Sequence, residues 1–167
     1  MYLKYFNFIK APFELTPNAD FFYFSAIHQD VYKTLMYGIE NLKGFLVLTG
    51  PVGSGKTTIS RLIMDKIHSS ETIPKIKIAY IFNPTLSFVE LLKNMLIDFG
   101  VRFNKKENSK VYLLESLNKF LIKEYSENRI VATIIDESQL ISIETLEEIR
   151  LLTNLETNNH TLIQIIL

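Results

Sequence analysis

Short apolar runs alternate with amphipathic stretches along most of the chain. The apolar runs, at residues 44–49, 76–82, 129–135 and 161–167, are typical of strands covered on both faces of a sheet. The stretches between them place apolar residues at helical spacing. They predict helices over about 26–42, 56–68, 87–100 and 142–156. A further helix is predicted to begin at the edge of the polar stretch 104–109 and to run to about residue 125. This alternation predicts an α/β fold with a mostly parallel sheet, which binds ligands at the carboxyl ends of its strands.

Several predicted helices carry capping residues at their ends. Ser25 and Ser142 precede helical patterns and are typical N-caps. Ser87 and Glu90 form a capping box, and Gly100 is a typical stop signal for the same helix. Its apolar residues lie on one side, so we expect them in the core. They are Phe88, Leu91, Leu92, Met95, Leu96 and Phe99.

Aromatic residues gather near the N-terminus. The chain has 12 phenylalanines and 8 tyrosines, and twelve of these 20 aromatic residues lie in the first 45 positions. We expect 1–43 to form an aromatic segment and a helix packed onto a core made by 44–167. The length of 167 residues suits a single domain, so the whole range 1–167 is predicted to fold as one unit.

The composition excludes several classes of protein. Eighteen basic and 18 acidic residues cancel, so no global field attracts nucleic acid or anionic lipid. The chain has no cysteine, which excludes disulfides, thiolate metal sites and a cysteine nucleophile. Its apolar runs are too short to cross a bilayer, and the N-terminus lacks the pattern of a signal peptide. We therefore expect a cytoplasmic protein.

A glycine-rich stretch, GPVGSGKT at residues 50–57, separates the first predicted strand from the next helix. It matches the phosphate-binding pattern G-x-x-x-x-G-K-[ST]. Consecutive backbone N–H groups can wrap a phosphate chain only at φ angles that glycine adopts at low cost, and the helix N-terminus adds free N–H groups. The predicted nucleotide-binding residues are Gly50, Pro51, Val52, Gly53, Ser54, Gly55, Lys56, Thr57 and Thr58.

The expected chemistry rests on four side chains. Lys56 is expected to neutralise the β- and γ-phosphates, and the Thr57 hydroxyl to bind Mg²⁺. The third predicted strand ends at Asp136 and Glu137, the pattern of a Walker B element. We expect Asp136 to serve the metal and Glu137 to act as the general base for water. The Asp-Glu pair favours ATP hydrolysis, and the lack of an N-K-x-D element favours ATP over GTP.

Phrases outside these motifs resemble a known family. YFNFIKAPFELTPNADFFYFS, FNPTLSFVELL and IIDESQLISIETLEEIRLLTNLET look like the AAA+ ATPases of the general secretion pathway protein A type, in the same order. The resemblance covers essentially the whole chain and implies a P-loop AAA+ core with strand order 5-1-4-3-2. It also implies a chain truncated after the fourth core strand, without the fifth strand and the lid. The first strand is then expected to form a hydrophobic sheet edge.

The resemblance implies further roles for individual residues. Asn83 lies where AAA+ proteins hold the Walker B glutamate inactive, which makes it a candidate catalytic residue. The alternative is a plain Asn-Pro turn after a strand. The aromatic segment is expected to pack beside the nucleotide, with His28 or Tyr32 at the adenine.

The family also implies a cellular setting. Its members act as oligomeric ATPases, so the resemblance implies a homo-oligomeric ring at the cytoplasmic face of the inner membrane, with a secretion or pilus-assembly partner there. One alternative is a transposition helper that binds DNA under the control of ATP. Another is a nucleotide-binding subunit with little hydrolysis, because the family's arginine finger lies beyond Leu167.

Overall fold

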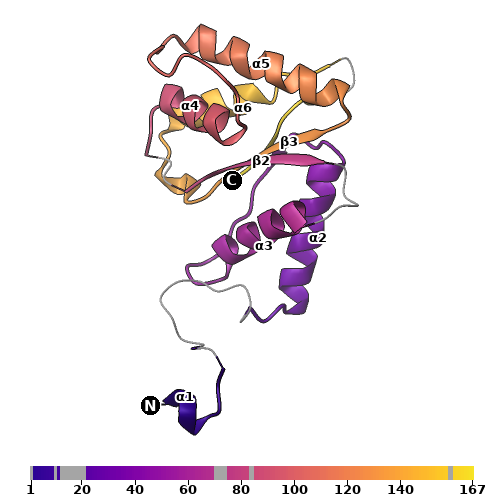
Figure 1. The fold of residues 1–167 in the computed structure, drawn as a ribbon, viewed down its shortest axis with the longest axis vertical. Helices are drawn as coiled ribbons and strands as arrows, with labels where there is room; N and C mark the ends of the chain where they lie inside the picture. The colour runs from indigo at the N-terminus through magenta and orange to yellow at the C-terminus, as the bar shows by residue number, and fades with distance from the viewer. Residues whose placement is uncertain (1, 10, 12–21, 70–74, 83–84, 158–159) are drawn as a thin grey trace.

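The computed structural model describes residues 2–9, 11, 22–69, 75–82, 85–157 and 160–167 (Figure 1). Helices and strands alternate along the chain after the N-terminal region. The elements are α1 (Tyr2–Tyr5), α2 (Ala26–Glu40), β1 (Phe45–Leu46), α3 (Lys56–Ser69), β2 (Ile76–Ile81), α4 (Phe88–Asp98), α5 (Lys110–Ser126), β3 (Ile130–Ile135), the 3-10 helix η2 (Ser138–Leu140), α6 (Ile143–Leu152) and β4 (Gln164–Ile166).

The four strands form one sheet in the order β1-β4-β3-β2. All three strand pairs are parallel, with Ala79 opposite Thr133 and Thr133 opposite Ile165. The predicted α/β class and strand order are therefore confirmed, and β1 lies at one edge of the described sheet as expected. Since the strands are parallel, their carboxyl ends meet at one side of the molecule.

Helices cover both faces of the sheet (Figure 1). Successive side chains of a strand point to opposite faces, and β3 follows this rule. Val131 and Ile135 pack in a core with α4, α5 and α6, whereas Ala132 and Ile134 pack in a second core with α2 and α3. The predicted apolar stripe of α4 is buried in the first core. The second core holds α3, and with it the glycine-rich stretch, against the sheet.

The predicted caps are confirmed. Ser25 and Ser142 accept backbone hydrogen bonds at the starts of α2 and α6, and both halves of the capping box at Ser87 and Glu90 are formed. Helix α6 ends four residues earlier than expected, because the chain turns and Glu156 pairs with Thr161 in an isolated antiparallel bridge. Strand β1 is also shorter than its apolar run.

Among the described residues 2–9 none is buried, unlike the packed segment that the sequence predicts; residues 10 and 12–21 of that segment lie outside the described residues. Helix α1 buries no residue and lies apart from the rest of the structure in Figure 1. Aromatic rings at the end of α1 and just after it contact one another: Tyr5 meets Phe6 edge-on at 4.9 Å, and Phe6 stacks on Phe8 at 5.7 Å. Among the described helices, none is both long enough and apolar enough to span a bilayer.

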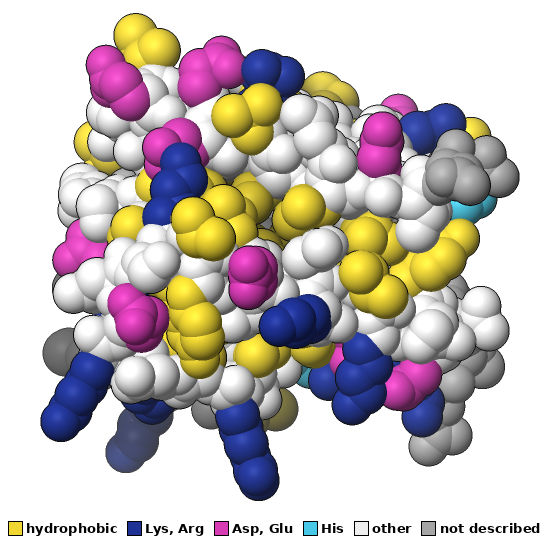
Figure 2. All heavy atoms as spheres, turned by 90° about the horizontal axis from the view of Figure 1, so that it is seen from above, with side chains coloured by type: hydrophobic (Ala, Val, Ile, Leu, Met, Phe, Trp, Pro, Cys, Tyr) yellow, Lys and Arg dark blue, Asp and Glu magenta, His cyan; other side chains and the backbone are white. Residues whose placement is uncertain are grey.

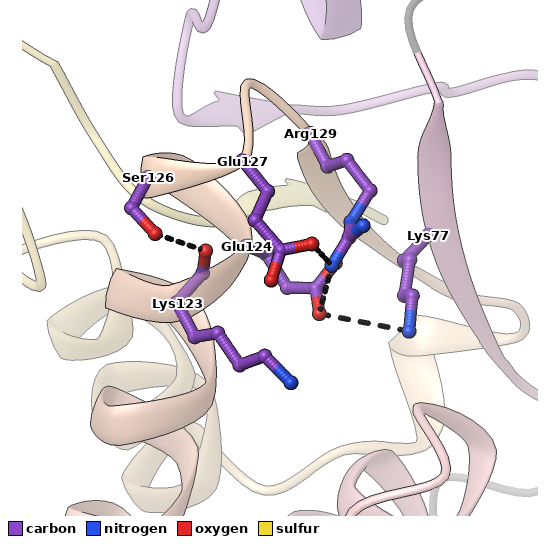
Figure 3. Close-up of polar contacts among 6 residues, drawn as sticks. All are labelled: Lys77, Lys123, Glu124, Ser126, Glu127 and Arg129. Atoms are coloured by element: carbon purple, nitrogen blue, oxygen red, sulfur yellow. Dashed lines mark hydrogen bonds and ion pairs between the residues drawn. The ribbon is translucent and has the colours of Figure 1, made fainter.

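A buried carboxylate joins α5 to the amino ends of two strands (Figure 3). The Glu124 side chain is only 2% exposed and accepts hydrogen bonds from Arg129, one of them 3.1 Å from Nη2 to Oε1. Lys77 Nζ lies 3.6 Å from the same oxygen. Burial raises the pKa of Glu124, but the Arg129 hydrogen bond and the Lys77 charge outweigh it, so the pKa is lowered overall. The ionised carboxylate thus stabilises the fold.

We expect Glu124→Gln to lower the free energy of unfolding by about 2 kcal/mol at pH 7, because Arg129 loses the buried one of its two carboxylate partners and keeps only Glu127. Since folding lowers the pKa of Glu124, its stabilisation is complete above the ordinary value of 4.5 and disappears as the pH falls through the folded value. Urea unfolding between pH 7 and pH 3 measures the difference. Glu115→Gln, on the exposed side of α5, is the control. A difference that does not shrink as the pH falls contradicts the ion-pair explanation.

Candidate functional site

The glycine-rich loop joins β1 to α3 at the carboxyl end of the sheet. Gly53 and Gly55 have φ angles of 79° and 87°, in the left-handed region that glycine adopts without strain. A Cβ on Gly55 would also lie 3.1 Å from Phe22 Cε2. Helix α3 begins at Lys56, so its first N–H groups have no carbonyl partner within the helix. The loop therefore offers backbone donors together with the positive end of a helix dipole.

Lys56 lies over the loop that precedes it. Its Nζ donates to Gly50 O at 2.8 Å and to Pro51 O at 3.0 Å. Both acceptors are loop carbonyls, so the ammonium group is held at the loop by groups that a phosphate oxygen can replace. This is the position expected for a lysine that neutralises phosphate.

The two predicted metal ligands meet in space. Thr57 Oγ1 donates to Asp136 Oδ2 at 2.8 Å, although the residues are 79 positions apart in the chain. Thr57 is in the first turn of α3, and Asp136 follows β3, where its N–H continues the ladder to Ile81 O at 2.9 Å. The parallel sheet thereby brings the glycine-rich loop and the Walker B pattern together.

A tyrosine that the sequence analysis missed also contacts Asp136. Tyr80, on β2, donates its hydroxyl to Asp136 Oδ2 at 2.8 Å. Burial raises the pKa of Tyr80 well above its ordinary value, and the hydrogen bond and charge of Asp136 raise it further. The phenol therefore stays protonated and remains a donor. Asp136 Oδ1 accepts the Glu137 N–H at 2.9 Å, so hydrogen bonds hold both carboxylate oxygens.

Glu137 is held in an unusual backbone conformation. Its φ of 53° lies in the left-handed region, which costs a non-glycine residue on the order of 1 kcal/mol or more. Gln139 Nε2 donates to Glu137 Oε2, and this contact too was absent from the sequence analysis. Both residues line the same cleft as the loop. Asn83, the candidate partner of Glu137, lies outside the described residues.

Two hollows flank the loop. A cleft of about 800 Å³ is lined by all nine predicted nucleotide-binding residues and by Glu137 and Gln139. A second hollow of about 420 Å³ lies beside Phe22, Ile27 and His28 and shares the loop as a wall. Of the two residues expected at the adenine, His28 lines this hollow. Tyr32 is absent from the described lining and packs against Phe24, with ring centroids 5.7 Å apart.

The geometry brings most of the predicted site together. Lys56, Thr57, Asp136 and Glu137 lie around the glycine-rich loop, as their motifs suggested. Tyr80 was missed because it belongs to no local motif, and Gln139 because the motif that contains it assigns it no role. Only the alternation along β2, which turns Tyr80 towards α3 with Ile78, could have indicated the contact made by Tyr80. Gln139 lies only two positions after Glu137, so its closeness could have suggested the contact.

Comparison with known proteins gives consistent results. A family model described as AAA domain matches residues 39–167. General secretion pathway protein A of Aeromonas hydrophila is 35% identical over 167 residues, which covers 100% of this chain and 29% of that protein. The chain thus spans less than a third of the length of this curated relative.

Solved structures show the same fold at low identity. Cdc6p from Pyrobaculum aerophilum aligns with a TM-score of 0.59 at 15% identity, over 83% of this chain and 36% of that one. The ORC2 protein of Aeropyrum pernix in its ADP form aligns with a TM-score of 0.63 at 17% identity, over 93% and 43%. With the family match and the parallel sheet, these findings confirm the fold and the resemblance that the sequence indicated. The chain belongs to the AAA domain family and has the α/β fold of the P-loop AAA+ ATPases.

Proposed function

We propose that this chain is an ATP-binding module that uses Mg²⁺ and whose site is built to hydrolyse ATP. One observation carries the proposal: the hydrogen bond between Thr57 and Asp136, which joins a glycine-rich loop at a helix start to an acidic strand end. A glycine turn that merely connected a strand to a helix would have no need of this contact. Nor would it need an acid directly after Asp136.

The residues present fit a nucleoside triphosphate. The positive φ angles of the loop glycines let consecutive backbone N–H groups face a phosphate chain. Helix α3 supplies free N–H groups at its start, and Lys56 supplies the positive charge. The cleft of about 800 Å³ is within the range of small-molecule and cofactor sites. These features favour a ligand with several adjacent phosphates.

The residues also fit Mg²⁺. A hydroxyl from Thr57 and a carboxylate from Asp136 are hard oxygen ligands of the kind that Mg²⁺ prefers. When bound, the ion supplies charge neutralisation for the phosphate oxygens. Asp136 is well placed for this role because Tyr80 and the Glu137 N–H fix both of its oxygens.

Glu137 is the proposed general base. Gln139 holds Oε2 of its carboxylate, which leaves Oε1 as the oxygen proposed to take a proton from water. The strained backbone of Glu137 supports a functional role, because such conformations cluster at active sites. A regulatory contact from Asn83 stays a prediction.

The wider role follows the curated relative. We propose that the chain works in a homo-oligomer at the cytoplasmic face of the inner membrane, with a secretion or pilus-assembly partner. The 35% identity to general secretion pathway protein A supports this assignment. A DNA-binding role has less support, because the net charge is zero and the face in Figure 2 mixes acidic, basic and apolar side chains.

Lys56→Ala is expected to weaken ATP binding at least tenfold, because the loop loses its only side-chain cation for phosphate. Isothermal titration with ATP and Mg²⁺ measures the change. Lys66→Ala, on the exposed side of the same helix, is the matched control and should bind like the wild type. Equal affinities for the two variants would refute the phosphate site.

Glu137→Gln is expected to keep ATP affinity and to lower steady-state phosphate release by roughly 10²–10⁴-fold, the usual contribution of a general base. Glu115→Gln again serves as control. If the wild-type chain binds ATP but releases no phosphate, the module is a nucleotide-binding subunit and not an ATPase.

Tyr80→Phe is expected to reduce, by roughly tenfold, the gain in ATP affinity that Mg²⁺ provides, since Asp136 loses an orienting hydrogen bond. Affinity in the presence of EDTA should stay unchanged. Titrations with and without Mg²⁺ separate the two quantities, and Tyr125→Phe on α5 is the control. An equal loss in EDTA would mean that Tyr80 supports the fold and not the metal site.

A further inference from the structure

His28 links the start of α2 to the glycine-rich loop. Its Nε2 lies 3.1 Å from Ser54 O, and its Nδ1 lies 2.9 Å from Ser25 Oγ. A carbonyl oxygen can only accept, so Nε2 must carry the hydrogen and donate to Ser54. In the neutral ring, Nδ1 then accepts from the Ser25 hydroxyl. Both ring nitrogens therefore have protein partners, and the tautomer follows from those partners.

The bond to Ser54 fixes the peptide group between Ser54 and Gly55. A trans peptide is planar, so its C=O and N–H point in opposite directions. Holding the Ser54 carbonyl towards His28 therefore turns the Gly55 N–H away from His28. Gly55 immediately precedes the first residue of α3, where phosphate-binding loops present their backbone donors.

Packing keeps the imidazole in place. The Phe22 and His28 rings lie 4.8 Å apart between centroids, and both are half-buried. A Cβ at Gly55 would come within 3.1 Å of Phe22 Cε2 and 3.4 Å of His28 Nε2. The ring thus lies between Phe22 and the loop, where its hydrogen bonds are partly shielded from water.

We infer that His28 is a positioning residue for the phosphate-binding loop: through Ser54 O it orients the Gly55 N–H towards the bound phosphate chain. The inference rests on the proposed nucleotide-binding function and gives that site a support outside its sequence motif. It also differs from a contact with the base. Since Ser25 and Ser54 occupy both ring nitrogens, neither is left to recognise adenine.

The test uses two variants of matched length. His28→Gln keeps an N–H donor that can reach Ser54 O, whereas His28→Met has a similar length and no donor. Affinities are measured by displacement of a fluorescent ATP analogue, with ATP and with inorganic triphosphate, which has no base. His28→Phe is a second donor-free variant, which keeps the ring packing against Phe22. Thermal melts of all three variants report their folding.

We expect His28→Met and His28→Phe to weaken ATP and triphosphate binding by the same factor, roughly three- to tenfold, the effect of one lost hydrogen bond. His28→Gln should restore most of the affinity for both ligands. A loss confined to ATP would show a base contact and overturn the inference. So would unchanged affinities, or a loss in His28→Gln equal to that in His28→Met. A wild-type chain that binds neither ligand would instead refute the proposed function.

Discussion

The hydrogen bond between Thr57 and Asp136 is the contact on which the candidate site depends. It joins the start of α3 to the end of β3, and a hydrogen bond to a charged acceptor contributes about 1.5–3 kcal/mol. The bond can form only because β4 pairs in parallel with both β1 and β3, which brings the glycine-rich loop and the acidic strand end to one side. The sheet topology is thus the physical condition for the site.

Support for this site comes from three directions. Tyr80 reaches Asp136 from β2, Gln139 holds Glu137 from η2, and His28 reaches the loop from α2. Each contact is made from a regular element or its first turn, so the site is oriented by rigid parts of the fold. At the opposite end of the strands, Glu124 ties α5 to the starts of β2 and β3.

The two edges of the described sheet differ. On β2, the outward N–H of Tyr80 is capped by Asp98 Oδ2 at 3.1 Å, and a charged group there opposes pairing with another strand. On β1, the residue that follows the strand, Val47, is 60% exposed. The expected hydrophobic edge is therefore next to the glycine-rich loop that β1 precedes.

The sequence alone determined the local features of this protein. Capping serines, the apolar stripe of α4, the alternation of strands and helices, the glycine-rich loop and the Asp-Glu strand end all depend on residues close together in the chain, so periodicity and motif spacing reveal them. The family resemblance added the strand order, which the structure confirms.

Only the tertiary structure decided the contacts that complete the site. Tyr80 meets Asp136 across 56 positions and His28 meets Ser54 across 26, and neither pair has a local pattern. Helix α6 ends early because Glu156 pairs with Thr161. Strand β1 is short because only Phe45 and Leu46 of its apolar run pair with β4 as a strand. The physical reason is the same in each case: the contact depends on how the helices, strands and loops pack in space, and the spacing of apolar residues along the chain does not specify that packing.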